Sequence, residues 1–321
     1  MAESQKNQSK TREQVRSVRI TERHDGQRLD NFLIRELKGV PRTRIYRIIR
    51  RGEVRVNKKR CKPDFKLSVG DEVRIPPVRE GKRSIPSKIS PAIAELLQSS
   101  VLLETDLLLV INKPAGLSVH GGSGVRLGII EALRQMKQEW RHAELAHRLD
   151  RDTSGCLIIA KKANALKQIQ DEFKGKRVEK IYHALVHGQW PEEIVEISAP
   201  LRKNQLSSGE RIVQVSADGK SAETRFTVLE RYAMASLLEV SPTTGRTHQI
   251  RVHCQYAGYP ILGDQKYGPK SMQNELKPIK KLCLHAAKIR FSDPASDGWL
   301  EVEALGIKSS EALNLNYDLY I

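Results

Sequence analysis

The stretch ELAHRLDRDTSGCLIIAKK, residues 144–162, decides the fold of the larger part of this chain. Its second half, CLIIAKK, is a short apolar run of the kind that forms a buried β-strand. Its first half sets His147, Arg148, Asp150, Arg151 and Asp152 directly before that run. Polar groups at a strand end often line a cleft, because the strand holds the backbone while the side chains face outward. The stretch therefore predicts a functional loop that leads into a core strand.

Similar β-type runs occur elsewhere after residue 100. They are LLLVINK (107–113), IYHALVHGQW (181–190), AETRFTVLERY (222–232) and ASLLEVSP (235–242). Helical periodicity is present near residues 128–140 and 163–174. Because strands and helices are interleaved, residues 93–321 are predicted to form one α+β domain.

The positive charge of the chain is concentrated near its start. The net charge is +17, and residues 1–90 hold 25 Lys and Arg against 11 Asp and Glu. Such a local surplus favours a polyanionic partner, most commonly nucleic acid. A basic face that is merely solvated is the alternative.

A helix is predicted within this basic region. Leu29, Phe32, Leu33 and Leu37 recur at helical spacing, and the pattern ends near Gly39. They describe one apolar face that must pack against a partner.

A second helix follows Pro41 and has two unlike faces. Ile45, Ile48 and Ile49 share one arc, and arginines fill the other. A strand, a turn and a strand follow in GEVRVNKKR (52–60) and DEVRIP (71–76). We predict that this platform binds RNA phosphates through Arg42, Arg44, Arg47, Arg50, Arg51, Arg55, Lys58 and Lys59.

The predicted organisation is a disordered tail (1–17), a small domain (18–76), a linker (77–92) and the α+β domain (93–321). The linker assignment rests on PPVREGKRSIPSKISP, which holds four prolines. Four separated cysteines without a C-x-x-C pair indicate neither disulfides nor a thiolate zinc site. No apolar run is long enough for a membrane helix, and the polar start lacks a signal-peptide pattern, so we expect a cytoplasmic protein.

Four polar motifs flank the β-type runs. They are NKPAGLSVHGGSG (112–124), HRLDRDTSG (147–155), KIYHALVHG (180–188) and TGRTHQIRVH (244–253). Each also has an ordinary explanation: residues 152–155 suit a turn, Tyr182 suits a strand interior, and 244–253 suits a solvated basic strand. The histidines lack a compact metal-ligand pattern, so no metal is expected.

The arginines of the last motif point to a further possibility. An arginine that is half buried there, Arg246 or Arg251, needs a carboxylate partner, and Asp150 is suitable. Burial disfavours an ionised carboxylate, so an opposed arginine would keep Asp150 charged and reactive.

The four motifs, in this order and at these separations, resemble those of the RluA-type pseudouridine synthases. Residues 27–76 also resemble the S4-like RNA-binding domain found in many RNA-modifying enzymes. The resemblance implies a mixed, mainly antiparallel sheet preceded by the S4-like domain. It further implies isomerisation of uridine to pseudouridine without cofactor or metal, and we expect the substrate to be large-subunit ribosomal RNA. We expect no protein partner and a monomer.

The resemblance also implies roles for single residues. Asp150 corresponds to the catalytic aspartate, which attacks ribose or uracil or removes a proton. Arg246 corresponds to its ion-pair partner. Tyr182 corresponds to the active-site tyrosine, whose ring stacks on the flipped uracil or whose hydroxyl helps to remove the C5 proton. Arg148 corresponds to the residue that fills the gap left by that base.

Two segments depart from the pattern, namely GDQKYG (263–268) and the C-terminal IKSSEALNLNYDLYI (307–321). We expect neither to touch the catalytic motifs. A non-catalytic RNA-binding assembly factor on the same fold is the alternative function, and it would be marked by loss of Asp150, which is present. An RNA-cleaving hydrolase would need a metal cluster or histidine pair that the motifs do not supply.

Overall fold

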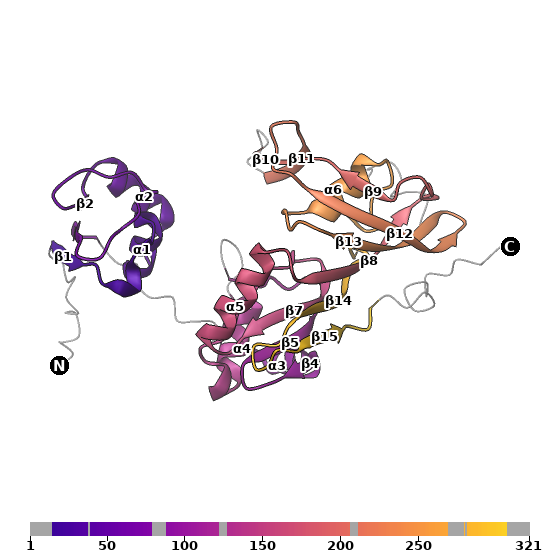
Figure 1. The fold of residues 1–321 in the computed structure, drawn as a ribbon, viewed down its shortest axis with the longest axis horizontal. Helices are drawn as coiled ribbons and strands as arrows, with labels where there is room; N and C mark the ends of the chain where they lie inside the picture. The colour runs from indigo at the N-terminus through magenta and orange to yellow at the C-terminus, as the bar shows by residue number, and fades with distance from the viewer. Residues whose placement is uncertain are drawn as a thin grey trace, which may run out of the picture. The chain divides into compact units, whose positions relative to one another are not determined.

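The chain divides into two units, residues 1–87 and 88–321, each described here by itself (Figure 1). The computed structural model describes residues 15–37, 39–78, 88–121, 127–205, 211–268, 279 and 281–306. Residues 1–14 of the predicted tail, 79–87 of the predicted linker and the divergent segment 307–321 lie outside the described residues.

The first unit packs two helices and a short 3-10 turn against a small sheet. Its elements are β1 (Arg16–Arg19), η1 (Glu22–His24), α1 (Leu29–Glu36), α2 (Arg42–Arg50), β2 (Arg55–Val56) and β3 (Glu72–Ile75). The sheet order is β1-β3-β2, and both pairs are antiparallel. The predicted apolar faces form one core, with Phe32, Leu33, Ile45 and Ile48 almost fully buried.

One prediction for this unit is wrong. Arg16 and Ser17 were expected in a disordered tail, yet they pair with Ile75 and Arg74 as the start of β1. The segment RSVRI offers only two apolar residues, so its strand character comes from pairing with β3 rather than from its own pattern.

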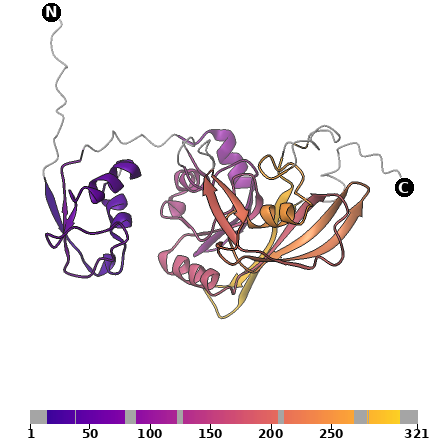
Figure 2. The ribbon, with the colours of Figure 1, turned by 90° about the horizontal axis from the view of Figure 1, so that it is seen from above.

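A ten-stranded mixed sheet organises the second unit (Figures 1 and 2). The path of neighbours is β4-β5-β7-β14-β8-β13-β12-β9, with β15 on β14 and β6 on β7. Among these pairs only β7 with β14 is parallel, which matches the mainly antiparallel sheet that was expected.

The strands of the second unit are β4 (Val101–Glu104), β5 (Leu108–Lys113), β6 (Glu144–Leu145), β7 (Ser154–Ala160), β8 (Glu179–His187), β9 (Glu196–Ser198), β10 (Leu201–Gln205), β11 (Arg211–Val215), β12 (Glu223–Tyr232), β13 (Ala235–Pro242), β14 (Leu284–Ser292) and β15 (Trp299–Glu303). Its helices are α3 (Pro91–Ser99), α4 (Ile129–Met136), η2 (Gln138–Trp140), α5 (Ala163–Lys174) and α6 (Gln249–Tyr256). Strands β10 and β11 form a separate hairpin.

Strand β7, predicted from CLIIAKK, is buried on both faces. Leu157 and Ile159 pack with α4 on one side, and Cys156 and Ile158 pack with α5 on the other. This explains why its sequence is continuously apolar rather than alternating. The strand thereby fixes the end of the loop that precedes it.

Gly155, near the start of β7, is required by backbone geometry. Its φ is +106°, and a Cβ there would lie 2.2 Å from the carbonyl oxygen of Ala286. Only glycine allows β7 and β14 to approach this closely directly after the polar loop.

Candidate active site

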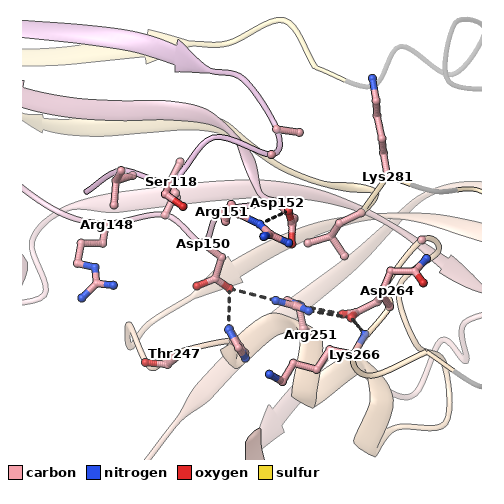
Figure 3. Close-up of a pocket in the computed structure, with 18 of the residues that line it drawn as sticks. Ser118, Arg148, Asp150, Arg151, Asp152, Thr247, Arg251, Asp264, Lys266 and Lys281 are labelled. Atoms are coloured by element: carbon pink, nitrogen blue, oxygen red, sulfur yellow. Dashed lines mark hydrogen bonds and ion pairs between the residues drawn. The ribbon is translucent and has the colours of Figure 1, made fainter. Parts of the chain in front are cut away.

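Two adjoining hollows in the second unit share Asp150. Figure 3 shows residues that line the larger one. The larger hollow has a volume of about 710 Å³ and the smaller about 490 Å³. Arg148, His248 and Arg251 line both, so Asp150 lies where the two hollows meet. The predicted Tyr182 and Arg246 line the smaller hollow. All four polar motifs therefore contribute residues to the two hollows.

A buried lysine forms hydrogen bonds to the backbone of the loop that carries Asp150 and of the segment beside it. Lys113 is completely buried, and its Nζ donates to the carbonyl oxygens of Pro114, Leu117 and Arg151 at 2.8–2.9 Å. Burial lowers the pKa of Lys113 to about 8, against the charges of Asp152 and Asp150. Lys113 therefore ties the NKPAG segment to the HRLDRD loop.

His147 fixes the other end of the same loop. Its Nε2 accepts a hydrogen bond from the backbone N–H of Ile158 at 3.0 Å, and its ring lies against Phe173. Burial lowers the pKa of His147 to about 3, so the ring stays neutral and keeps its acceptor nitrogen. His147 is a structural anchor of the loop.

Asp150 is contacted by two basic side chains from the TGRTHQIRVH motif. Its Oδ2 lies 3.6 Å from Nη1 of Arg251 and 3.8 Å from Nε2 of His248. The carboxylate keeps 29% of its side chain exposed, whereas Arg251 keeps only 7%. Figure 3 shows Asp150 and Arg251 pointing toward each other across the hollow.

The predicted ion pair of Asp150 with Arg246 is therefore wrong, and Arg251 takes that place. Arg246 is exposed and donates from Nε to the carbonyl oxygen of Ser221. The reason is local: α6 begins at Gln249, so His248 and Arg251 lie one helical turn apart and face the same hollow. The helical spacing of these two residues was the signal that could have found them.

Arg251 is held by a second carboxylate. Asp264 is fully buried and accepts hydrogen bonds from Nε and Nη2 of Arg251 at 2.7 and 2.8 Å. Burial alone would lower the pKa of Arg251, but the hydrogen bonds and charge of Asp264 raise it above its usual value. Asp264 belongs to GDQKYG, so the expectation that this segment stays away from the catalytic motifs is wrong.

Tyr182 lies on β8, between β14 and β13. It packs against apolar residues of two core clusters and lines the smaller hollow. Burial, and then the charge of Asp150, raise the pKa of the Tyr182 hydroxyl above its usual value. The hydroxyl is therefore protonated at neutral pH.

The remaining polar residues of the loop divide into two kinds. Arg151 and Asp152 pair with each other at 2.9 Å on the surface, and Thr153 is buried. Arg148 is exposed and lines both hollows, and no hydrogen bond or ion pair of its guanidinium is found within the described parts of the chain. Arg148 is thus the loop cation that is open to a ligand.

The predicted basic residues of the first unit lie on its surface. Arg42, Arg47 and Arg50 are exposed on α2, while Arg44 is partly buried. Arg51, Arg55, Lys58 and Lys59 are exposed after the helix, and Asn57 and Lys58 form the turn with φ of 48° and 66°. This set of residues is called the basic face below.

Neither a metal cluster nor a membrane helix is found in the described residues. No group of three or more His, Cys, Asp or Glu side chains among them is arranged to hold a metal ion. None of their helices is long and apolar enough to cross a bilayer.

Comparison with known proteins defines the class. The RNA pseudouridylate synthase family profile matches residues 107–256, and the S4 domain profile matches residues 27–73. The chain belongs to the RNA pseudouridylate synthase family, and it is an RNA pseudouridine synthase with an S4 domain before its α+β domain. The fold and family predictions are confirmed.

The individual relatives are close. Ribosomal large subunit pseudouridine synthase C of Escherichia coli K12 is 52% identical over 296 residues, covering 90% of this chain and 92% of that protein. The synthase C of Haemophilus influenzae is 52% identical over 295 residues, covering 90% and 91%. Among solved structures, human RNA pseudouridylate synthase domain containing 4 matches with a TM-score of 0.55 and 26% identity, covering 68% of this chain and 92% of that one.

Proposed function

We propose that this enzyme converts specific uridines of large-subunit ribosomal RNA to pseudouridine in the cytoplasm, acting as a monomer. The observation that carries the proposal is the position of Asp150, a partly exposed carboxylate where two hollows meet, held by a buried arginine. The named relatives, which act on the large subunit, support the choice of RNA.

The reaction is an isomerisation in which no atom is gained overall. The bond from ribose C1′ to uracil N1 breaks, the uracil turns, and C1′ bonds to C5. The C5 proton leaves to solvent, and N1 gains one. Asp150 attacks C1′ or C6 or removes a proton, and each role needs an ionised carboxylate, which Arg251 supports.

Asp150 presents its two oxygens differently. The closest approach of each basic side chain is to Oδ2, at 3.8 Å for His248 and 3.6 Å for Arg251. We therefore infer that these side chains hold the Oδ2 side of the carboxylate and that Oδ1 faces the substrate. A carboxylate oriented in this way reaches the reacting atom without having to break its ion pair.

The uridine must leave the RNA stack to reach Asp150. Unstacking one base costs a few kcal/mol, and a guanidinium inserted in its place recovers part of that cost. Arg148 suits this role because it is exposed at the rim of both hollows. Tyr182 stacks on the flipped uracil in the smaller hollow, and Arg246, on the same wall, binds the RNA backbone.

The test is release of tritium from carbon-5-labelled uridine in large-subunit RNA that lacks pseudouridine. We expect release by the wild type and a loss of at least about 100-fold for Asp150→Asn, which keeps the shape of the side chain but removes its charge. Exposed Asp297→Asn is the matched control and should keep full activity. Tight RNA binding without release by the wild type would favour the assembly-factor function.

A further inference from the structure

The ring of His248 is clamped in one orientation against Asp150. His248 Nδ1 lies 2.6 Å from the hydroxyl of Tyr267, and Nε2 faces Oδ2 of Asp150 at 3.8 Å. The residue has φ of 54° and ψ of 21°, a left-handed conformation that is uncommon for a residue with a Cβ. A backbone conformation of this kind persists only where surrounding contacts hold it. Here it occurs at the residue directly before α6.

The hydrogen bonds of Tyr267 determine which ring nitrogen of His248 carries the proton. The Tyr267 oxygen accepts a hydrogen bond from the backbone N–H of Val213 at 3.1 Å. With that bond accepted, we assign the hydroxyl as the donor to His248 Nδ1, which then carries no proton. In a neutral imidazole the proton is consequently on Nε2, the nitrogen that faces Asp150.

The surroundings favour the neutral ring. Burial lowers the pKa of His248 below its usual value, against the opposing charge of Asp150, and Arg251 and Lys266 add to the lowering. A neutral ring whose Nδ1 accepts from Tyr267 turns its Nε2–H toward Asp150. The positive end of this bond then lies near Oδ2, beside Arg251, without adding a second full charge.

We propose that His248, as the Nε2–H tautomer set by Tyr267, is a positioning residue whose Nε2–H faces Oδ2 of Asp150 across 3.8 Å, holds that side of the carboxylate electrostatically and leaves Oδ1 for the substrate. This inference rests on the proposed function of Asp150. It also assigns a structural role to the GDQKYG segment, because Asp264 orients Arg251 and Tyr267 orients His248. One loop therefore positions both partners of the reactive carboxylate.

The tautomer can be measured without any activity. In protein with ¹⁵N-labelled imidazoles, two-bond proton–nitrogen correlation at neutral pH should show His248 as Nε2–H, and the signal missing from His248→Met identifies it. Tyr267→Phe keeps the ring but removes the donor, so the His248 signal should shift toward the Nδ1–H form. An Nδ1–H tautomer in the wild type, or no change in Tyr267→Phe, would overturn the proposal.

Turnover then tests the role of the donor. Gln can present an N–H near the position of Nε2 and Met cannot, while the two side chains have the same length. We expect His248→Met to lose about 10- to 100-fold in kcat with little change in KM for RNA, and His248→Gln to recover most of the loss. Exposed His142→Met, outside both hollows, is the control.

The outcomes separate the two proposals. Full kcat in His248→Met would reject the positioning role, as would equal losses in the Met and Gln variants that both melt like the wild type. If the wild type itself releases no tritium, the proposed reaction fails, but the tautomer measurement still decides the orientation of His248.

Discussion

The basic face of the first unit and the site around Asp150 are both built from arginines, yet they are built in opposite ways. On the basic face, Arg42, Arg47 and Arg50 lie on the exposed side of a single helix, α2, because of their helical spacing. At the site, Arg251 is almost buried and is shared between two carboxylates from distant loops. The first arrangement is local and tolerant of change, whereas the second depends on several segments at once.

The Arg251→Gln variant tests the difference between buried and exposed arginines and should have the largest effect. Removing one partner of a buried pair leaves Asp264 uncompensated, so we expect a loss of about 3–5 kcal/mol in the free energy of unfolding. Exposed Arg246→Gln, five residues earlier, should cost less than about 0.5 kcal/mol. Urea unfolding of both variants makes the measurement, and equal losses would erase the distinction between the two kinds of arginine.

The same distinction explains what could be predicted from sequence. The helices of the first unit and β7 follow from apolar patterns within ten residues, and both are observed. The pairing of Asp150 does not follow from those apolar patterns. The helical spacing of His248 and Arg251 indicates it only when α6 is known to begin at Gln249, after the left-handed turn at His248. Asp264 was missed for the same reason, since only the folded chain brings it to Arg251.

The opposite side of the comparison is tested by neutralising the basic face. In the triple variant Arg42→Gln, Arg47→Gln and Arg50→Gln, we expect RNA affinity to fall by about tenfold to a hundredfold and the salt slope to decrease by about 2–3. Stability should hardly change, because all three side chains are exposed. Filter binding over a range of salt measures both quantities.

A matched control uses three cations that already have carboxylate partners, Arg225, Lys288 and Arg290. Changing these three to Gln removes the same charge from the chain. An equal loss of affinity and slope would mean that total charge matters and that the basic face has no special role.

The histidine that holds the loop of Asp150 should make the stability of the protein depend on pH. Because the folded pKa of His147 is lowered to about 3, the unfolded chain binds more protons below its usual pKa of about 6.5, and stability falls as the pH drops through that range. Protonation also removes the Nε2 acceptor of the Ile158 N–H. We expect a loss of about 2 kcal/mol between pH 7 and pH 5.

His147→Gln keeps an acceptor but cannot titrate, so its unfolding free energy should fall less than that of the wild type between pH 7 and pH 5. Exposed His142→Gln should follow the wild type. If His147→Gln declined as steeply as the wild type, the acid sensitivity would have to come from other buried histidines, of which His253 and His285 also have lowered pKa values through burial. Because His147 holds the loop of Asp150, the same change in pH should loosen the site before it loosens the basic face, whose described contacts include no buried histidine.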